Sequence, residues 1–373
     1  MNILILTWKD IKNPKKGWAE VVIYNYAKRL AKKWHNVFWY WPTFDWAKAY
    51  EEIEWIKIIR KYTLITLFFF TPFWYKKFIK NNKIDVIIDE AWWIPLLTSL
   101  YEKKDKVVFF IHHIWDKELD YSAFFPINKI LKCIYNSIIK LYKDHKTITV
   151  SNSTKEDLLR YWFKEENVTV IENWIDLNPI NNIDLSKKEK AFCFVWRMMP
   201  IKRVEDIIKA FYIFLGRIKD DYKLYIVWSP QNKKYFCKLK QIVNELNLDN
   251  KVIFTGFVSS DERDNIVSKS IASLLTSYKE WFWLNVLEAN AVWTTFIAYN
   301  VPWLKDSIKD WVNWYLVKES DIEGLADKMY LLATDKKILK DIITSGINYV
   351  KNYESWDKKA DKLEKILVRI KTW

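Results

Sequence analysis

Cysteine and long apolar runs are scarce in this sequence, and each scarcity excludes a class of protein. The chain has three cysteines, far apart and without the spacing of a metal site: Cys133, Cys193 and Cys237. Such an odd, unclustered set indicates free thiols in a reducing compartment and excludes a disulfide framework. The most apolar stretch, 64–75, is interrupted by Pro72 and is too short to span a bilayer. The apolar segment 2–6 has no basic stretch before it, so we expect no signal peptide and a cytoplasmic protein.

Glycine is also scarce, and tryptophan stands at several positions where glycine is expected. The chain has 5 Gly and 23 Trp, whereas an average chain of this length has roughly 26 Gly. Trp34 follows a predicted helix, where a left-handed backbone favours Gly. Trp174 and Trp314 each follow Asn, as Gly does in an Asn-Gly turn.

We therefore hypothesise that most of these tryptophans are glycine in the natural protein. A UGA codon that is translated as Gly in a few bacterial lineages and as Trp in others would produce this pattern. The alternative is a true Trp-rich protein. Three tryptophans occupy positions that suit an aromatic residue: Trp8, Trp74 and Trp356.

Basic residues outnumber acidic ones, 60 to 46, which gives a formal net charge of +14. Only eight of the basic residues are Arg, and the lysines are spread along the chain beside abundant Ile, Asn, Tyr and Phe. This pattern suits an AT-rich coding bias at least as well as a binding footprint. We expect no nucleic-acid partner and a weak attraction to an anionic membrane surface.

Short β-rich apolar runs alternate with amphipathic stretches, which predicts an α/β protein with parallel sheets. One series precedes the polar, Asn-rich stretch 175–190, and a second series follows it. We expect one domain at 1–175, a second at 176–352, and at 353–373 a charged amphipathic helix that packs back on the first domain. Two doubly wound sheets that face each other form a cleft, the usual place for a ligand in such folds.

The sequence has no motif that pairs a nucleophile with a base, and no Asp-x-Asp that would hold a metal-bound diphosphate. Arg197 and Lys202 instead follow the predicted strand 191–195 and precede a helix that begins at Val204. Arg contacts phosphate oxygens through paired donors and Lys adds a point charge, so together they would stabilise a departing diphosphate. The alternative is that both are solvated loop cations.

A second candidate segment, 279–288, carries two carboxylates, Glu280 and Glu288, around a turn that begins a helix. Amides at a helix N-terminus favour phosphate, and Gly in place of Trp281 and Trp283 would let the backbone approach it closely. Glu288 lies deeper in the helix, where it would accept hydrogen bonds from a pair of ribose hydroxyls. The alternative is that both carboxylates only cap the helix dipole.

With Gly at the suspect positions, the sequence resembles glycosyltransferase family 4, the group-1 glycosyltransferases, over nearly the whole chain. The segments that match the family's motifs, in its order and spacing, are 17–20 (Gly-Gly-Ala-Glu), 172–176 (Asn-Gly-Ile-Asp), 195–202 (Gly-Arg…Lys), 280–288 (Glu-x7-Glu), 301–303 (Pro-Gly) and 310–314 (Asp-Gly-x-x-Gly). The departures are consistently Trp for Gly. The resemblance implies the GT-B fold, in which two doubly wound, Rossmann-like domains face each other across a cleft.

The resemblance also implies a donor-binding role for each matching residue. Arg197 and Lys202 would stabilise the diphosphate, Glu280 would bind the donor sugar and Glu288 the ribose. The loop at Gly17 and Trp18 would close over the donor. Three backbone amides would cradle phosphate: those of Trp283, Leu284 and Asn285.

Two histidines follow the predicted strand 106–111, and the resemblance implies that one of them touches the sugar near the reacting carbon. We favour His113 over His112; a core or capping role is the alternative for either. Asp89 and Glu90, after the strand 86–88, would border the acceptor site, or they form a solvated pair at a strand end.

The reaction that the resemblance implies retains the anomeric configuration, and oxygens of the leaving group help to deprotonate the acceptor on the same face. No carboxylate pair at glycosidase separation is therefore required. The resemblance also implies that no metal or cofactor is needed. The donor would be a UDP- or GDP-sugar and the acceptor a glycan or glycolipid. Two alternatives stay open: a GT-B sugar-nucleotide epimerase, and a noncatalytic nucleotide-sugar-binding protein at a membrane surface. Literal tryptophans at 18, 196, 281 and 283 would block the diphosphate site and favour the second alternative.

Two segments suggest a peripheral position on the inner face of a membrane. The stretch 128–143 predicts a cationic amphipathic helix, and the aromatic residues 68–70, with Phe73 and Trp74, form a patch just before and within a helix expected at 73–81. The alternative is that both helices pack their apolar faces on a sheet.

Overall fold

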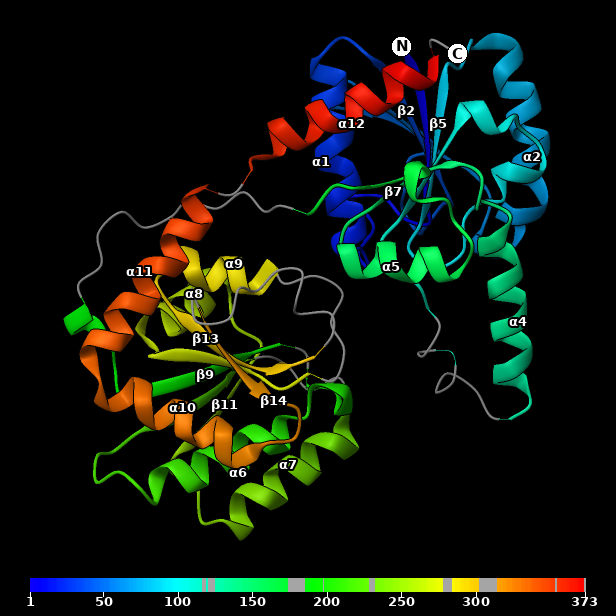
Figure 1. Ribbon diagram of the computed structural model, residues 1–373. Coiled ribbons are helices and arrows are strands. Elements are labelled where there is room, and N and C mark those ends of the chain that lie inside the picture. Colours follow the sequence, from blue (N-terminus) through cyan, green and yellow to red (C-terminus); the bar gives the residue numbers. More distant parts are fainter. Residues whose placement is uncertain are drawn as a thin grey trace. The chain divides into compact units, whose positions relative to one another are not determined.

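The computed structural model describes residues 1–115, 119, 125–173, 185–196, 198–227, 232–277, 284–301, 314–352 and 354–371. The chain divides into two compact units. Unit 1 comprises Met1–Trp174 with Glu354–Trp373, and unit 2 comprises Ile175–Tyr353. Each unit is a sheet of mostly parallel strands with helices on its faces (Figure 1). The predicted α/β class is confirmed.

Unit 1 contains an eight-stranded sheet in the order β3-β4-β2-β1-β5-β6-β7-β8. Its strands are β1 (Asn2–Leu6), β2 (Asn36–Trp41), β3 (Tyr50–Ile53), β4 (Ile56–Arg60), β5 (Val86–Ala91), β6 (Val107–Ile111), β7 (Lys146–Thr149) and β8 (Val168–Val170). Every neighbouring pair is parallel except β3 and β4, which form an antiparallel hairpin at the edge. Its helices are α1 (Trp18–Lys32), α2 (Leu64–Asn81), α4 (Ile127–Lys140), α5 (Asn152–Arg160) and α12 (Trp356–Lys371).

The two faces of this sheet are covered by different helices. Side chains of α2, α4 and α5 enter one hydrophobic cluster with alternate residues of the strands, such as Leu4, Leu6 and Phe109. On α1 and α12, Tyr26 and Trp356 pack edge to face at 5.3 Å, and Tyr26 also contacts Phe110, a neighbour of Phe109. Because adjacent strand residues point to opposite faces, α1 and α12 cover the other face.

Helix α2 begins earlier than the sequence pattern predicts. We expected it to start at Phe73, after Pro72, but it starts at Leu64 and contains Pro72 in its interior. Thr63 caps the first turn by accepting a hydrogen bond from the Thr66 amide. Pro72 removes one backbone donor, yet the helix continues because residues on both sides of it, Leu67 and Trp74, pack into the same cluster.

Unit 2 contains a six-stranded, wholly parallel sheet in the order β11-β10-β9-β12-β13-β14. Its strands are β9 (Ala191–Val195), β10 (Lys223–Val227), β11 (Val252–Gly256), β12 (Ala272–Leu275), β13 (Thr295–Asn300) and β14 (Trp314–Lys318). Its helices are α6 (Val204–Leu215), α7 (Lys233–Glu245), α8 (Ser260–Lys269), α9 (Leu284–Ala291), α10 (Ile322–Thr334) and α11 (Lys336–Asn352).

Each sheet has one place where the strand order reverses. In unit 1 the chain proceeds from β1 to β2 on one side, and β5 then pairs with β1 on the other side. In unit 2, β9 pairs with β10 on one side and with β12 on the other. Ligands of doubly wound sheets bind outside the carboxyl ends of the strands at such a reversal. We therefore expect ligands to bind at the carboxyl edges of the two sheets, next to these reversals.

Three helices end on a tryptophan with left-handed backbone. Trp34, Trp162 and Trp293 have φ of 65°, 62° and 62°, respectively. Each donates its N–H to the carbonyl three residues back, and the next residue donates to the carbonyl five back, as in a Schellman motif. A fourth helix, α7, ends in the same way on Asn247, with φ of 53°. Gly and Asn are the usual residues at this position.

No helix in the described part of the chain is both long enough and apolar enough to cross a bilayer.

Candidate functional site

Lys202 lies at the carboxyl end of β9, on the one-turn helix Pro200–Lys202 that leads into α6. It is a buried cation, 6 % exposed. Thr276, directly after β12, donates its hydroxyl to the Lys202 carbonyl at 2.8 Å and to the Arg203 carbonyl at 3.0 Å. The ends of β9 and β12 are thereby joined at the strand reversal, and this fixes the backbone that carries Lys202.

The side chain of Lys202 lies against a tryptophan ring. Its Nζ is 4.7 Å from the ring centroid of Trp196, the residue that follows β9. The indole N–H of Trp196 is buried and has no hydrogen-bond partner among the described residues. The ring therefore covers the cation that the sequence analysis assigned to a diphosphate.

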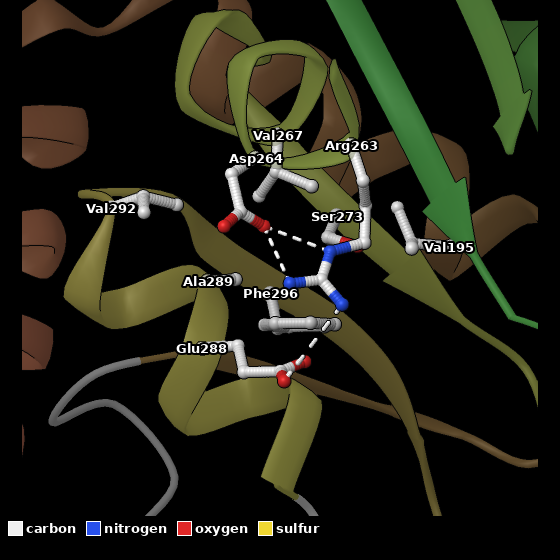
Figure 2. A pocket seen from close by; sticks show the side chains of 9 residues that line it. All are labelled: Val195, Arg263, Asp264, Val267, Ser273, Glu288, Ala289, Val292 and Phe296. Atoms are coloured by element: carbon white, nitrogen blue, oxygen red, sulfur yellow. Dashed lines mark hydrogen bonds and ion pairs between the residues drawn. The ribbon is translucent and has the colours of Figure 1, made fainter. Parts of the chain in front are cut away.

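Glu288 lies on α9, the helix after β12, and faces a small pocket in which Arg263 of α8 also points toward it (Figure 2). The Arg263 guanidinium lies 3.9 Å from the Glu288 carboxylate and 2.7 Å from that of Asp264. Burial raises the pKa of Glu288; Arg263 opposes this rise and Asp264 adds to it. The cavity of about 20 Å³ has room for about one water, so a ribose at Glu288 would require these side chains to move.

Arg263 was missed by the sequence analysis. The available signal was its residue type, because only eight Arg occur in this Lys-rich chain. Arg60, another of the eight, is buried between Asp10 and Glu51, at 2.5 Å from Asp10. In both cases Arg faces two carboxylates, a task that its planar guanidinium performs better than an ammonium.

Three predicted donor residues lie outside the described residues: Arg197, Glu280 and Trp283. Trp281, one of the suspected glycine positions, also lies outside them. Leu284 and Asn285 begin α9, which follows β12 in the chain, so their backbone lies at the N-terminus of that helix. Lys202 and Glu288 are therefore the predicted donor-side residues whose side chains the structure describes in unit 2.

In unit 1, Gly17 and Trp18 lie at the start of α1, the helix that follows β1. The Gly17 amide donates to the buried carboxylate of Glu20 at 2.5 Å, which caps the first turn. Trp18 is the first helical residue and is partly exposed. Both residues thus lie near the carboxyl end of β1, one of the two strands at the strand reversal of unit 1.

Asp89 has no access to solvent, so the expectation of a solvated pair at the end of β5 is wrong for this residue. Its carboxylate accepts hydrogen bonds from the Leu96 amide, the Thr98 amide and hydroxyl, and the Tyr142 hydroxyl, at 2.6–3.1 Å. Burial raises the pKa of Asp89, and these donors oppose the rise. The hydrogen bonds of Asp89 thus hold the loop after β5 against the segment that follows α4. Both of its carboxylate oxygens already accept hydrogen bonds within unit 1.

Glu90 is also buried, and the solvated alternative is wrong for it as well. Its Oε1 lies 3.1 Å from Nε2 of His112, which follows β6. Burial raises the pKa of Glu90, the contact with His112 lowers it, and the nearby carboxylate of Glu20 raises it again. The structure thus brings Glu20, Glu90 and His112 together at the carboxyl edge.

His113, the favoured histidine, is buried at the same edge, with its ring centroid 4.8 Å from that of Trp115. Among the described residues, no three His, Cys, Asp or Glu side chains form a group that could hold a metal ion.

Comparison with family models identifies the family. The model for group 1 glycosyl transferases matches residues 179–367, and that for glycosyltransferase family 4 matches residues 19–179. The protein belongs to the group 1 glycosyl transferases. The two matches meet at residue 179, close to the division between the units.

The chain is similar to curated glycosyltransferases in sequence and to solved structures in fold. N-acetyl-alpha-D-glucosaminyl L-malate synthase of Bacillus anthracis is 27% identical over 57% of this chain and 51% of its own length. The chain thus spans about half the length of this curated relative in the match. A glycosyltransferase from Rickettsia africae has a TM-score of 0.76 at 20% identity, covering 99% of this chain and 98% of the other. Anabaena HepE in complex with UDP has a TM-score of 0.75 at 16% identity, covering 99% and 100%. These likenesses confirm the predicted GT-B fold with two Rossmann-like domains.

Proposed function

We propose that this protein is a retaining glycosyltransferase that moves a sugar from a UDP- or GDP-sugar to a glycan or glycolipid acceptor without a metal ion. The observation that carries the proposal is Lys202, a buried cation at the strand reversal of unit 2, in a chain of the group 1 family. The UDP bound in the structurally similar Anabaena protein supports a nucleotide donor.

In the proposed reaction, the bond between the sugar's anomeric carbon and the diphosphate breaks while the acceptor oxygen bonds to that carbon on the same face. The acceptor's proton passes to an oxygen of the departing diphosphate. Lys202, with Arg197, balances the negative charge that develops on the leaving group, and a cation buried away from water does this most effectively. Glu280 binds the sugar, and Glu288 accepts hydrogen bonds from the ribose.

Unit 1 supplies the acceptor side of the proposed enzyme. His113 and the Gly17–Trp18 segment keep the roles that the family resemblance implies. Glu90 and His112 remain assigned to the proposed acceptor site because they form a buried acid–imidazole pair at the carboxyl edge of the sheet. Asp89 is no longer assigned to it, because its carboxylate already accepts hydrogen bonds from four donors.

The test is a transfer assay with a panel of UDP- and GDP-sugars and candidate acceptors, on the natural protein and on Lys202→Ala. Loss of one preorganised charge at a developing oxyanion lowers kcat by about 100- to 1,000-fold, and we expect this for Lys202→Ala. Lys209→Ala, an exposed lysine on α6, is the matched control and should retain full activity. A folded Lys202→Ala protein with an undiminished rate would contradict the assignment, and an epimerised donor without acceptor would favour the epimerase.

We also propose that the tryptophans at the phosphate-binding positions, and those at the helix ends, are glycine in the natural protein. Five of the eleven non-glycine residues with left-handed φ in the described part of the chain are Trp: Trp34, Trp46, Trp55, Trp162 and Trp293. Trp55 is the second residue of the two-residue turn between β3 and β4, where both turn residues have positive φ; Gly is the preferred residue there.

Buried indoles support the same proposal. The N–H groups of Trp196 and Trp314 are buried without a hydrogen-bond partner among the described residues. Each such group costs about 1–3 kcal/mol. Glycine at 196 would remove one of these groups and would also uncover the ammonium of Lys202.

Peptide mass spectrometry of the natural protein tests the recoding directly. We expect Gly in the peptides that contain positions 18, 196, 281 and 283, and at the helix ends 34, 162 and 293. Tryptophan at the first four positions would overturn the recoding and would leave a noncatalytic nucleotide-sugar-binding protein as the better explanation of the fold.

A further inference from the structure

Helix α2 exposes three phenylalanines in a row on one side. Phe69, Phe70 and Phe73 are 70 %, 46 % and 71 % exposed. Exposed rings that lie together are unusual on a monomeric protein and mark a surface that contacts something else. Phe68 and Trp74, which the sequence analysis placed in the same patch, instead point inward and contact the core of unit 1.

Three lysines extend this side of the helix toward its C-terminus. At 100° per residue, Lys76, Lys77 and Lys80 lie on the same face as the phenylalanines. All three are exposed. We call these six residues, Phe69, Phe70, Phe73, Lys76, Lys77 and Lys80, the α2 outer face.

The orientation of this face is fixed by the opposite side of the helix. Trp74 stacks on Tyr40 of β2, with ring centroids 3.8 Å apart, and on Phe78 at 4.7 Å. Tyr75 is buried and hydrogen-bonds Glu102. Rotation of α2 would break these contacts, so the exposed phenylalanines have no route into the core of unit 1.

The α2 outer face carries charge of one sign. The 18 residues of α2 include no Asp or Glu, and none of the three lysines forms an ion pair with another described residue. An aromatic surface continued by unpaired cations complements the boundary of an anionic bilayer, where rings enter between the headgroups and ammonium groups meet lipid phosphates.

Helix α4 lacks this combination, although it also exposes an apolar stripe, Ile127, Ile130 and Ile134. Its lysines, Lys129, Lys132 and Lys140, lie roughly 150° around the helix from that stripe. A flat partner that contacts the exposed isoleucines of α4 therefore cannot contact its lysines as directly as it can contact both the phenylalanines and the lysines of α2.

We propose that the α2 outer face binds an anionic lipid bilayer, with the helix lying along the surface. The phenylalanines insert at the level of the headgroups, and the three lysines, one to two turns further on, bind lipid phosphates. This surface is independent of the proposed transfer reaction, because it binds lipid without donor or acceptor.

Flotation of the purified protein with phosphatidylcholine vesicles, with and without phosphatidylglycerol, tests the proposal. We expect the protein to float only with the anionic vesicles and to be released by high salt. The variants Phe69→Ser/Phe73→Ser and Lys76→Glu/Lys77→Glu/Lys80→Glu should each weaken binding by at least about tenfold, while their thermal unfolding and any transfer to a water-soluble acceptor stay unchanged.

Unit 2 provides a matched control for charge. Lys336, Lys337 and Lys340 on α11 are exposed at the same spacing as the α2 lysines, and their replacement by Glu changes the net charge equally. Phe257→Ser, at a ring that is 75 % exposed, controls for the phenylalanines. The proposal is wrong if the α11 triple variant loses as much binding as the α2 variant. It is equally wrong if neutral vesicles bind as well, or if the Phe69→Ser/Phe73→Ser variant changes only the oligomeric state.

Discussion

Tryptophans occupy two contrasting environments in this molecule. Trp356, at the start of α12, is buried, packs against Tyr26 and lies under the guanidinium of Arg29. Trp34, at the end of α1, is 95 % exposed and has left-handed backbone. The first side chain contributes a large apolar contact area, whereas the second contributes none and occupies a conformation that disfavours any residue with a Cβ.

The contrast shows that a residue's environment can test its identity. A side chain that belongs to a fold is held by contacts, as Trp39 is by a 2.9 Å hydrogen bond to Thr7 and by its packing on Trp41. A side chain at the C′ position of a Schellman motif is defined only by the backbone, and the backbone favours Gly or Asn.

The largest effect is expected from Trp356→Ala. Truncation of a buried Trp lowers the free energy of unfolding by about 3–5 kcal/mol. The loss arises because the ring no longer packs on Tyr26 and no longer shields the apolar side of α1 from solvent. Urea unfolding of the protein with Trp at every position shown in the sequence should reveal this decrease in the free energy of unfolding. A decrease of less than about 1 kcal/mol would contradict the contrast between the two environments, because Trp356 would then contribute as little to stability as the helix-end tryptophans.

A smaller effect of opposite sign is expected from Trp162→Gly. Left-handed backbone costs a residue with a Cβ about 1–2 kcal/mol, and Gly removes this strain at an exposed site. Gly also removes the cation–π contact with the Lys140 ammonium, which lies 3.9 Å from the ring centroid and offsets part of the gain. We expect stability to rise by about 1 kcal/mol in the same urea experiment. Asn247→Gly, at the equivalent position of α7, is the control and should change stability less, because Asn already tolerates this conformation. Equal gains at both positions would show that helix ends in general, and not the tryptophans, limit stability.

The sequence predicted the fold well where strands and helices have strong periodicity. The predicted strand 191–195 is β9, and α6 begins at Val204 as predicted. The misses have physical causes: β3 and β8 are short strands at the edges of the unit 1 sheet, where one side lacks a partner and the apolar pattern is weak. The start of α2 was missed because packing of Leu67 and Trp74 overrides the break that Pro72 predicts locally.

The site was predicted less completely. Lys202 and Glu288 were assigned to the candidate site from the order of the family's motifs, and they lie after β9 and on the helix after β12, respectively. The burial of Asp89 and Glu90 could not be predicted, because their partners Tyr142 and His112 are distant in the sequence, after α4 and after β6, respectively. Burial of an acid depends on such donors, and single-sequence spacing does not contain them.

Helix α12 has a consequence for the order in which the molecule is made. It belongs to unit 1, where Asp357 and Glu364 pair with Arg29 and His35 on and after α1, yet the whole of unit 2 precedes it in the chain. During synthesis, α1 is released from the ribosome long before α12 is translated. Until then the apolar surface around Tyr26 lacks its cover, so unit 1, although its synthesis begins first, cannot complete its fold before α12 has been made.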